Sequence, residues 1–467
     1  MNDSRLSSGH QPLDEVLGGG LPGNGISIIT GLPGSGKTII AQQYAFRNAR
    51  PDRPVVYFST LSEPLEKIIR FGQTLEFFDA AAVGRSVFYE DLGQVASRDG
   101  LTGVGDHLAS ALKQRRPGLV IIDSFKALRA LADDDAAFRA FLHQLAGRLT
   151  AFPAASLWVG EYEPGEAATA PEFAVADAIV DLTVVPLGQR EKRFLHVRKL
   201  RGSGFLSGRH GYRLTHQGLR LFPRLADTPA ADGYQLGGHR TTTGLPGLDA
   251  MLDGGLWPGS ATLVTGPSGS GKTIMGLHFI YGGAAHGERG IIATFQENAT
   301  QLNRTLSSLG WPAANPAVEI MYRSPVDIYI DEWVHELLES AERTQARRVV
   351  IDSVLDLQLA SIEETRFREF MYSLAQRLSR QGITLLSTYE TPGLPGDGRL
   401  PEFALSYLAD NVITLAYHRD HGAMSRTLAV TKARASRHDA AIRPFIISAD
   451  GISLNGGHPA PGRPDQS

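Results

Sequence analysis

Apolar runs that end in polar residues recur along the chain and predict buried β-strands. In the first half they lie at residues 26–30, 55–58 and 119–122, and the first two are followed by helical patterns. Short, nearly uninterrupted apolar runs are typical of strands covered on both faces, as in a parallel sheet. Strands that alternate with helices indicate an α/β domain.

The second half of the chain repeats this pattern. Apolar runs return at residues 263–264, 291–293 and 349–351, and both halves open with a short helical stretch closed by glycines, at 13–20 and 248–255. We therefore predict a duplicated domain, with boundaries at 1–223 and 241–453 and a linker at 224–240. Residues 454–467 are polar and rich in Gly and Pro, so we expect this tail to be disordered.

The composition argues against several classes of protein. Of 467 residues, 42% are hydrophobic and 20% are charged, which is ordinary for a globular protein. The absence of cysteine excludes disulfides and thiolate metal sites and suits a reducing cytoplasm. A net charge of −3 gives nucleic-acid binding no support, and no apolar run reaches membrane-spanning length. We expect a cytoplasmic protein without membrane or nucleic-acid partners.

Each half carries a phosphate-binding loop between its first core strand and a helix. The loops are residues 31–38 and 266–273, both of the form G-x-x-x-x-G-K-T, and their lysines are 235 positions apart. The glycines let backbone N–H groups turn toward phosphate oxygens, the lysine reaches the β- and γ-phosphates, and the threonine hydroxyl holds Mg²⁺. The predicted ATP-binding residues are Gly34, Ser35, Gly36, Lys37, Thr38 and Ile39, and Gly269, Ser270, Gly271, Lys272, Thr273 and Ile274.

An aspartate closes a later apolar strand in each half. Asp123 and Asp352 both follow a run of apolar residues and precede a serine. Many strands end in Asp, but downstream of a phosphate loop such a carboxylate orders the Mg²⁺ water shell. We predict Thr38, Asp123, Thr273 and Asp352 as the magnesium residues, with Glu297 beside them.

Acidic residues near the end of the strand after each loop are candidates for a water-activating base. These are Glu63 in the first half and Glu297, preceded by Gln296, in the second. Carboxylates are also common at helix starts, so residue type alone leaves both interpretations open.

Two late strands carry a Lys-x-Arg pair. The segments are Lys199-Leu200-Arg201 and Lys432-Ala433-Arg434. Side chains alternate along a strand, so both cations share one face. They could stabilise charge at a nucleotide, or they could be protective charges on a solvated edge strand.

These motifs together resemble the KaiC-like family of circadian-clock ATPases and autokinases within the RecA superfamily. The resemblance covers roughly residues 5–453 and includes the duplication. It implies two tandem RecA-like P-loop NTPase domains, each a mostly parallel twisted sheet flanked by helices. It also implies a hexameric double ring with ATP between protomers, where the two Lys-x-Arg segments reach a neighbour's nucleotide.

The chain departs from the family where the family has two consecutive glutamates. Leu61 and Ser62 stand there in the first half, with Glu63 displaced by one, and Gln296 and Glu297 in the second. The family's adjacent phosphorylation sites correspond to Ser406 and Tyr407.

The leading hypothesis is an ATPase ring with serine autokinase activity in the second domain, acting as a signalling switch read by a protein partner. The alternatives are a recombinase-like, DNA-dependent ATPase and a nucleotide-bound scaffold with little turnover.

Overall fold

The computed structural model describes residues 5–60, 64–163, 165–166, 169–225, 238–312, 314–391, 408–420 and 423–454. The chain divides into two compact units, Met1–Arg224 and Leu225–Ser467. The linker and tail boundaries proposed from the sequence remain predictions, because residues 226–237 and 455–467 lie outside the described ranges.

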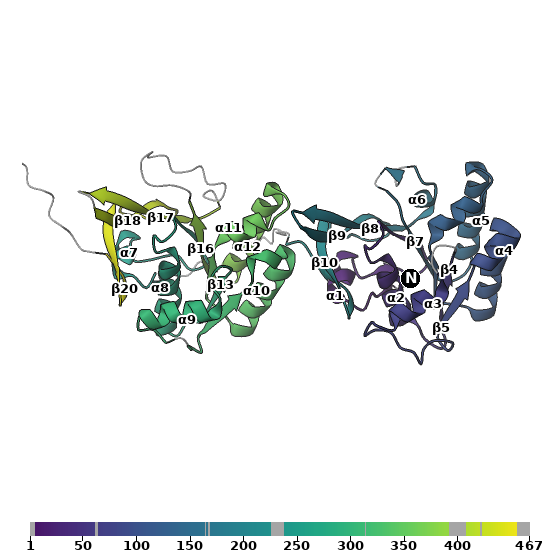
Figure 1. Ribbon diagram of the computed structural model, residues 1–467, viewed down its shortest axis with the longest axis horizontal. Coiled ribbons are helices and arrows are strands. Elements are labelled where there is room, and N and C mark those ends of the chain that lie inside the picture. Colours follow the sequence, from purple (N-terminus) through teal and green to yellow (C-terminus); the bar gives the residue numbers. More distant parts are fainter. Residues whose placement is uncertain are drawn as a thin grey trace, which may run out of the picture. The chain divides into compact units, whose positions relative to one another are not determined.

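The first unit is built on a nine-stranded sheet of order β11-β10-β9-β8-β3-β7-β6-β4-β5 (Figure 1). The strands from β8 to β5 in this order are parallel, whereas β9, β10 and β11 extend the sheet in antiparallel fashion. The strands are β3 (Ile26–Gly31), β4 (Val55–Ser59), β5 (Val87–Asp91), β6 (Leu119–Asp123), β7 (Ala155–Gly160), β8 (Ala178–Leu187), β9 (Arg190–Leu200), β10 (Arg209–Thr215) and β11 (Gly218–Phe222). A separate two-stranded sheet joins β1 (Arg5–Leu6) to β2 (Leu21–Pro22).

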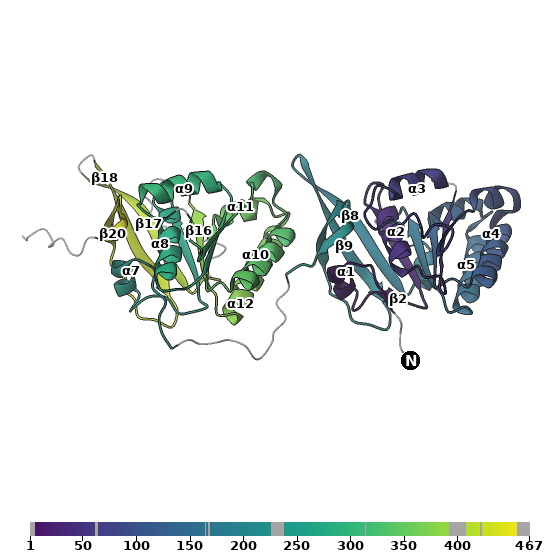
Figure 2. The ribbon, with the colours of Figure 1, turned by 90° about the horizontal axis from the view of Figure 1, so that it is seen from below.

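Helices cover both faces of this sheet because alternate residues of its strands point to opposite sides. Val55 and Tyr57 pack with one helix group, and Val56 and Phe58 with the other. Figure 2 shows α2 on one face and α4 with α5 on the opposite face. The helices are α1 (Gln11–Val16), α2 (Lys37–Asn48), α3 (Leu65–Gly72), α4 (Gly93–Arg115), α5 (Asp135–Thr150) and α6 (Glu172–Val175), with a 3₁₀ helix at Phe125–Leu131.

The second unit repeats the arrangement with a nine-stranded sheet of order β14-β13-β15-β16-β12-β17-β18-β19-β20. Its strands are β12 (Ala261–Gly266), β13 (Gly290–Thr294), β14 (Val318–Tyr322), β15 (Arg348–Asp352), β16 (Thr384–Glu390), β17 (Asn411–Asp420), β18 (Ala423–Ala433), β19 (Arg443–Ser448) and β20 (Gly451–Leu454). Its helices are α7 (Pro246–Met251), α8 (Lys272–Ala285), α9 (Ala299–Ser308), α10 (Ile330–Thr344), α11 (Val354–Leu359) and α12 (Glu364–Arg380), with a 3₁₀ helix at Pro325–Asp327.

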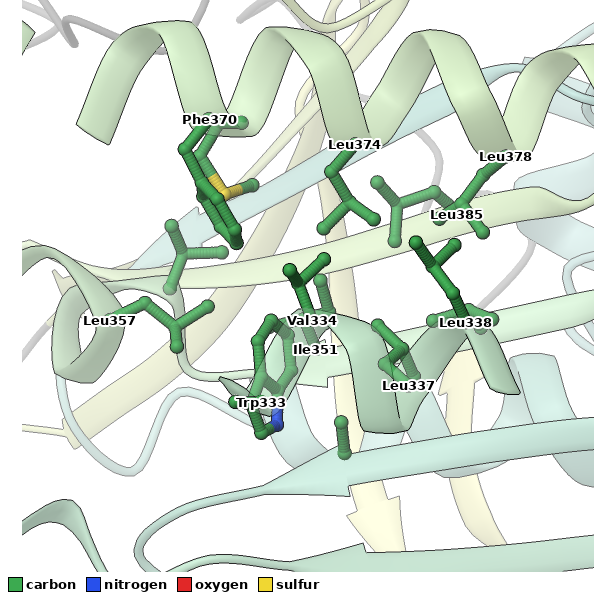
Figure 3. Packing of buried hydrophobic residues seen from close by; sticks show 14 of the residues in the cluster. Trp333, Val334, Leu337, Leu338, Ile351, Leu357, Phe370, Leu374, Leu378 and Leu385 are labelled. Carbon is green, nitrogen blue, oxygen red and sulfur yellow. The ribbon is translucent and has the colours of Figure 1, made fainter. Parts of the chain in front are cut away.

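One core of the second unit lies where α10, α11 and α12 meet the sheet (Figure 3). Trp333 of α10 packs near Phe370 of α12, with ring centroids 6.4 Å apart. Burying aromatic side chains of this size contributes about 2–3 kcal/mol each. The structure confirms the predicted fold class, two tandem α/β domains with mostly parallel sheets. Within the described ranges no helix combines the length and the apolarity needed to cross a membrane.

Candidate functional site

The first phosphate loop leaves the carboxyl end of β3 and runs into α2. Gly34 and Gly36 adopt φ values of +77° and +93°, a region that side-chain-bearing residues rarely occupy. A Cβ on Gly36 would also lie 2.6 Å from the side chain of Leu214. Lys37 begins α2, and its Nζ donates a hydrogen bond of 2.9 Å to the Leu32 carbonyl and lies 3.3 Å from Glu161 Oε1.

The second loop has the same geometry between β12 and α8. Gly269 and Gly271 have φ values of +73° and +105°. Lys272 Nζ donates hydrogen bonds of 3.0 Å and 2.9 Å to the carbonyls of Gly266 and Pro267, and lies 3.9 Å from Glu390 Oε2. In both halves the lysine is therefore folded back over its loop toward a glutamate at the carboxyl end of the adjacent strand.

Buried polar groups line both loops. The hydroxyl oxygens of Ser35 and Ser270 are buried without a hydrogen-bond partner among the described residues. Burial also lowers the pKa of Lys37 and Lys272, against which Glu161 and Glu390 act. A bound anion would add negative charge beside the two lysine ammonium groups, which already contact backbone carbonyls and a glutamate.

The strand-end aspartates reach the loop threonines. Thr38 Oγ1 donates to Asp123 Oδ2 at 2.8 Å, and Thr273 Oγ1 donates to Asp352 Oδ2 at 2.7 Å. Among the described residues no group of three or more His, Asp or Glu side chains could hold a metal ion. Mg²⁺ characteristically uses one or two protein oxygens together with phosphates and waters, so this donor set fits Mg²⁺ that binds with a nucleotide.

Glu297 lies close to this position in the second half. Its Oε2 is buried without a partner among the described residues, and burial, followed by the charge of Asp352, raises its pKa. The neighbouring Gln296 instead donates through Nε2 to Asp356 Oδ2 of the helix α11, at 3.1 Å. The structure thus groups Glu297, and not the side chain of Gln296, with Asp352.

In each half the Lys-x-Arg segment lies level with the start of the first core strand, whereas the phosphate loop follows the end of that strand. Leu200 pairs with Ala178 of β8, and Ala178 pairs with Ser27 near the start of β3, whereas the loop begins at Gly31. Four residues of strand span about 13 Å. Ala433 is placed in the same way, level with Thr262 of β12.

Both basic segments contact the chain that precedes β8 or β17. Lys199 Nζ lies 3.4 Å from the Phe173 carbonyl, and Arg201 lies 3.5 Å from Asp177. In the second half, Lys432 Nζ donates to the Ala409 carbonyl at 2.7 Å and Arg434 lies 3.8 Å from Asp410. Burial, followed by the neighbouring arginine, lowers the pKa of both lysines. Neither half brings its basic segment to its own phosphate loop.

Glu63, Ser406 and Tyr407, with Leu61 and Ser62, lie outside the described residues. The structure adds two residues that the sequence analysis did not assign to the site, Glu161 and Glu390. They are 229 positions apart, the same spacing that separates Asp123 from Asp352. That shared spacing was the signal that could have identified them.

A pocket of about 720 Å³ opens beside the first loop. Lys37, Thr38 and Asp123 line its polar part, and Phe71, Leu75 and Leu214 contribute apolar surface. This combination of apolar walls with a few convergent polar groups is typical of small-molecule sites.

Comparison with known proteins agrees with this geometry. A family model described as the KaiC ATPase matches twice, at residues 6–226 and 241–457. The chain is 28% identical over 460 residues to the circadian clock oscillator protein KaiC 1 of Synechocystis sp., covering 94% of this chain and 87% of that protein. It is 28% identical over 471 residues to the circadian clock protein KaiC3 of the same organism, with 96% and 91% covered. The KaiC of Synechococcus elongatus is 28% identical over 457 residues, with 94% and 87% covered. The two family matches together span nearly the whole chain, and the chain belongs to the KaiC family of ATPases.

Proposed function

We propose that each half binds Mg-ATP at its phosphate loop and that the second half also transfers phosphoryl groups to the protein itself. The observation that carries the proposal is the repeated geometry of a loop lysine beside a glutamate and a loop threonine bonded to a strand-end aspartate. A coincidental glycine-rich turn would not reproduce these four side chains twice.

In each site different residues bind the phosphates, hold the magnesium ion and accept the proton. Lys37 and Lys272 hold the phosphates, while Thr38 with Asp123 and Thr273 with Asp352 hold the magnesium ion and its waters. Bound Mg²⁺ supplies charge neutralisation on the β- and γ-phosphates. Glu297 accepts the proton of the attacking water or hydroxyl, a role supported by its raised pKa and by a buried oxygen that has no partner among the described residues. Glu63 is the corresponding candidate in the first half.

The basic segments complete a neighbour's site in a homo-oligomeric ring, which by family resemblance is a hexamer. Lys199 and Arg201, like Lys432 and Arg434, lie too far from their own loops to serve there. Cations placed at the γ-phosphate stabilise charge that develops during transfer. The relatives are named as circadian clock proteins, which supports a role as an ATP-driven switch read by a protein partner.

Ser406 is the proposed phosphoacceptor and Tyr407 the next candidate. Both precede β17 by a few residues in the sequence, and the proposal for them rests on their position in the chain. In-line transfer needs little beyond positioning, Mg²⁺ and a carboxylate to take the proton.

Incubation with γ-labelled ATP tests the proposal. The Lys37→Ala variant isolates the second half, and in that background Glu297→Gln should reduce phosphate release by at least about tenfold. Label should appear on the protein and be lost in Ser406→Ala. Full release in Glu297→Gln would exclude it as the base, and label retained in Ser406→Ala would move the acceptor elsewhere.

Two control measurements separate the alternative functions. Bound ATP without turnover in the parent would favour the scaffold hypothesis. Turnover that rises strongly with DNA would favour the DNA-dependent ATPase, and γ-labelled ATP with and without DNA measures it directly.

A further inference from the structure

The two strand-end aspartates are held by side chains that are not equivalent in the duplication. In the first half the hydroxyl of Tyr57 donates to Asp123 Oδ2 at 2.7 Å, the same oxygen that Thr38 contacts. In the second half Thr388 Oγ1 donates to Asp352 Oδ1, while Thr273 contacts Oδ2. Tyr57 and Thr388 are both fully buried.

These donors approach the aspartate from opposite sides. In the first sheet β6 lies between β4 and β7, and in the second β15 lies between β13 and β16. Tyr57 belongs to β4, two residues before Ser59, which pairs with Asp123. Thr388 belongs to β16, one residue after Ser387, which pairs with Ile351. The long phenol of Tyr57 reaches diagonally from β4 to Asp123 on β6. The short hydroxyl of Thr388 reaches directly from β16 to Asp352 on β15.

The equivalent positions in the opposite half carry no donor. Val159 pairs with Asp123 where the second half has Thr388. Ile292 lies two residues before Thr294, which pairs with Asp352, where the first half has Tyr57. Each half therefore supplies a buried hydroxyl to its aspartate from one flanking strand and an aliphatic side chain from the other.

We propose that Tyr57 and Thr388 are positioning residues that fix the carboxylates of Asp123 and Asp352 for magnesium binding. The inference rests on the proposed binding of Mg-ATP. A carboxylate that contacts the waters of a metal ion must hold one rotamer, and partners that orient metal ligands typically change metal affinity by about 10- to 100-fold when removed. Packing alone would not require a hydroxyl at either position, because Val159 and Ile292 fill the matching spaces without one.

The duplication supplies a rescue substitution for the test, because each half shows where the other half could place its hydroxyl. Tyr57→Phe removes the phenol oxygen and keeps the ring, whose centroid lies 5.2 Å from that of Tyr89. Adding Val159→Thr then gives the first half the arrangement of the second. In the second half Thr388→Val removes the donor, and Thr388→Ser keeps it.

The experiment measures the affinity for a non-hydrolysable ATP analogue as Mg²⁺ is titrated. The same affinity is then measured with a chelator present and no metal. Lys272→Ala removes nucleotide binding at the second site while the first is studied. Lys37→Ala removes binding at the first site while the second is studied. We expect Tyr57→Phe to weaken Mg²⁺-dependent binding at the first site by about 10- to 100-fold and to leave metal-free binding unchanged. Val159→Thr should restore most of the loss, and Thr388→Ser should behave like the parent while Thr388→Val does not.

The outcomes separate this inference from the proposed function. A parent protein that shows no Mg²⁺-dependent binding at either site would overturn the proposed function. Parent-like Mg²⁺ dependence in Tyr57→Phe and Thr388→Val would overturn the positioning role alone. So would an equal loss with and without metal, because that result would indicate a general structural defect.

Discussion

His278 should make the second unit sensitive to mild acid. Its side chain is 8% exposed on α8, where Nε2 accepts a hydrogen bond of 2.8 Å from the Ile452 backbone N–H of β20. The indole of Trp311 lies edge-on, with ring centroids 4.7 Å apart. Burial lowers the pKa of His278 to about 4, and a hydrogen bond with the Gly244 backbone acts against this shift. Protonation would therefore replace an acceptor with a donor that faces another N–H group.

The size of the expected loss in stability follows from the pKa of His278 in the folded chain and in the unfolded chain. The folded-state pKa is about 4 and the ordinary value is 6.5, so between these pH values the unfolded chain binds a proton that the folded chain does not. Stability that is present above pH 6.5 is then lost as the pH falls toward 4. The free energy of unfolding should decrease by about 2 kcal/mol between pH 7.5 and pH 5.0 from this side chain alone.

The first unit supplies the matched control. Gln43 occupies the same place on α2, where its Oε1 accepts from the Leu219 N–H at 3.0 Å and its Nε2 donates to the Ser8 carbonyl at 3.0 Å. Glutamine makes these two bonds without titrating. His278→Gln should therefore fold and lose the acid sensitivity that His278 contributes.

Hydrogen exchange of peptides that contain β20, corrected for intrinsic rates, measures the opening free energy at each pH. Other carboxylates also titrate in this range, so the informative quantity is the difference between the parent and His278→Gln. A pH dependence that is the same in both proteins would refute the reasoning. So would a direct titration that places the pKa of His278 near 6.5.

The remaining predictions concern the nucleotide sites. Lys37→Ala and Lys272→Ala should each remove about half of the ATP that copurifies with the chain, because each eliminates one loop's cation; an unchanged ATP-to-protein ratio would contradict the duplicated site. Arg201→Ala and Arg434→Ala should slow turnover without removing ATP, and light scattering should show assembly of the parent with ATP, whereas a monomer at saturating ATP would contradict the ring. The raised pKa of Glu297 should move the acidic limb of the pH–rate profile above the ordinary glutamate range. Because the ionised form of a group with a raised pKa is disfavoured on folding, Glu297→Gln should raise the unfolding midpoint at neutral pH, and a lower midpoint would contradict this burial effect.

The parts of the site that lie close together in the sequence could be predicted from it. A phosphate loop is a local structure, because its glycines, lysine and flanking elements are contiguous, and the order of strands and helices indicated the fold. The contact of Lys37 with Glu161 could not be predicted in this way, since it depends on β7 lying beside β3. The bond from Tyr57 to Asp123 likewise requires the order of β4 and β6 in the sheet.

The placement of Arg201 at the far end of its sheet from Lys37 has a consequence for mixtures of chains. In the proposed ring, every first-half site combines the loop of one chain with the cations of the next. A chain with Lys37→Ala still offers an intact arginine, and a chain with Arg201→Ala still offers an intact loop. Two preparations that are each impaired in the first half should therefore complement one another when subunits exchange. The recovered turnover would report the fraction of sites at which an intact loop meets an intact arginine.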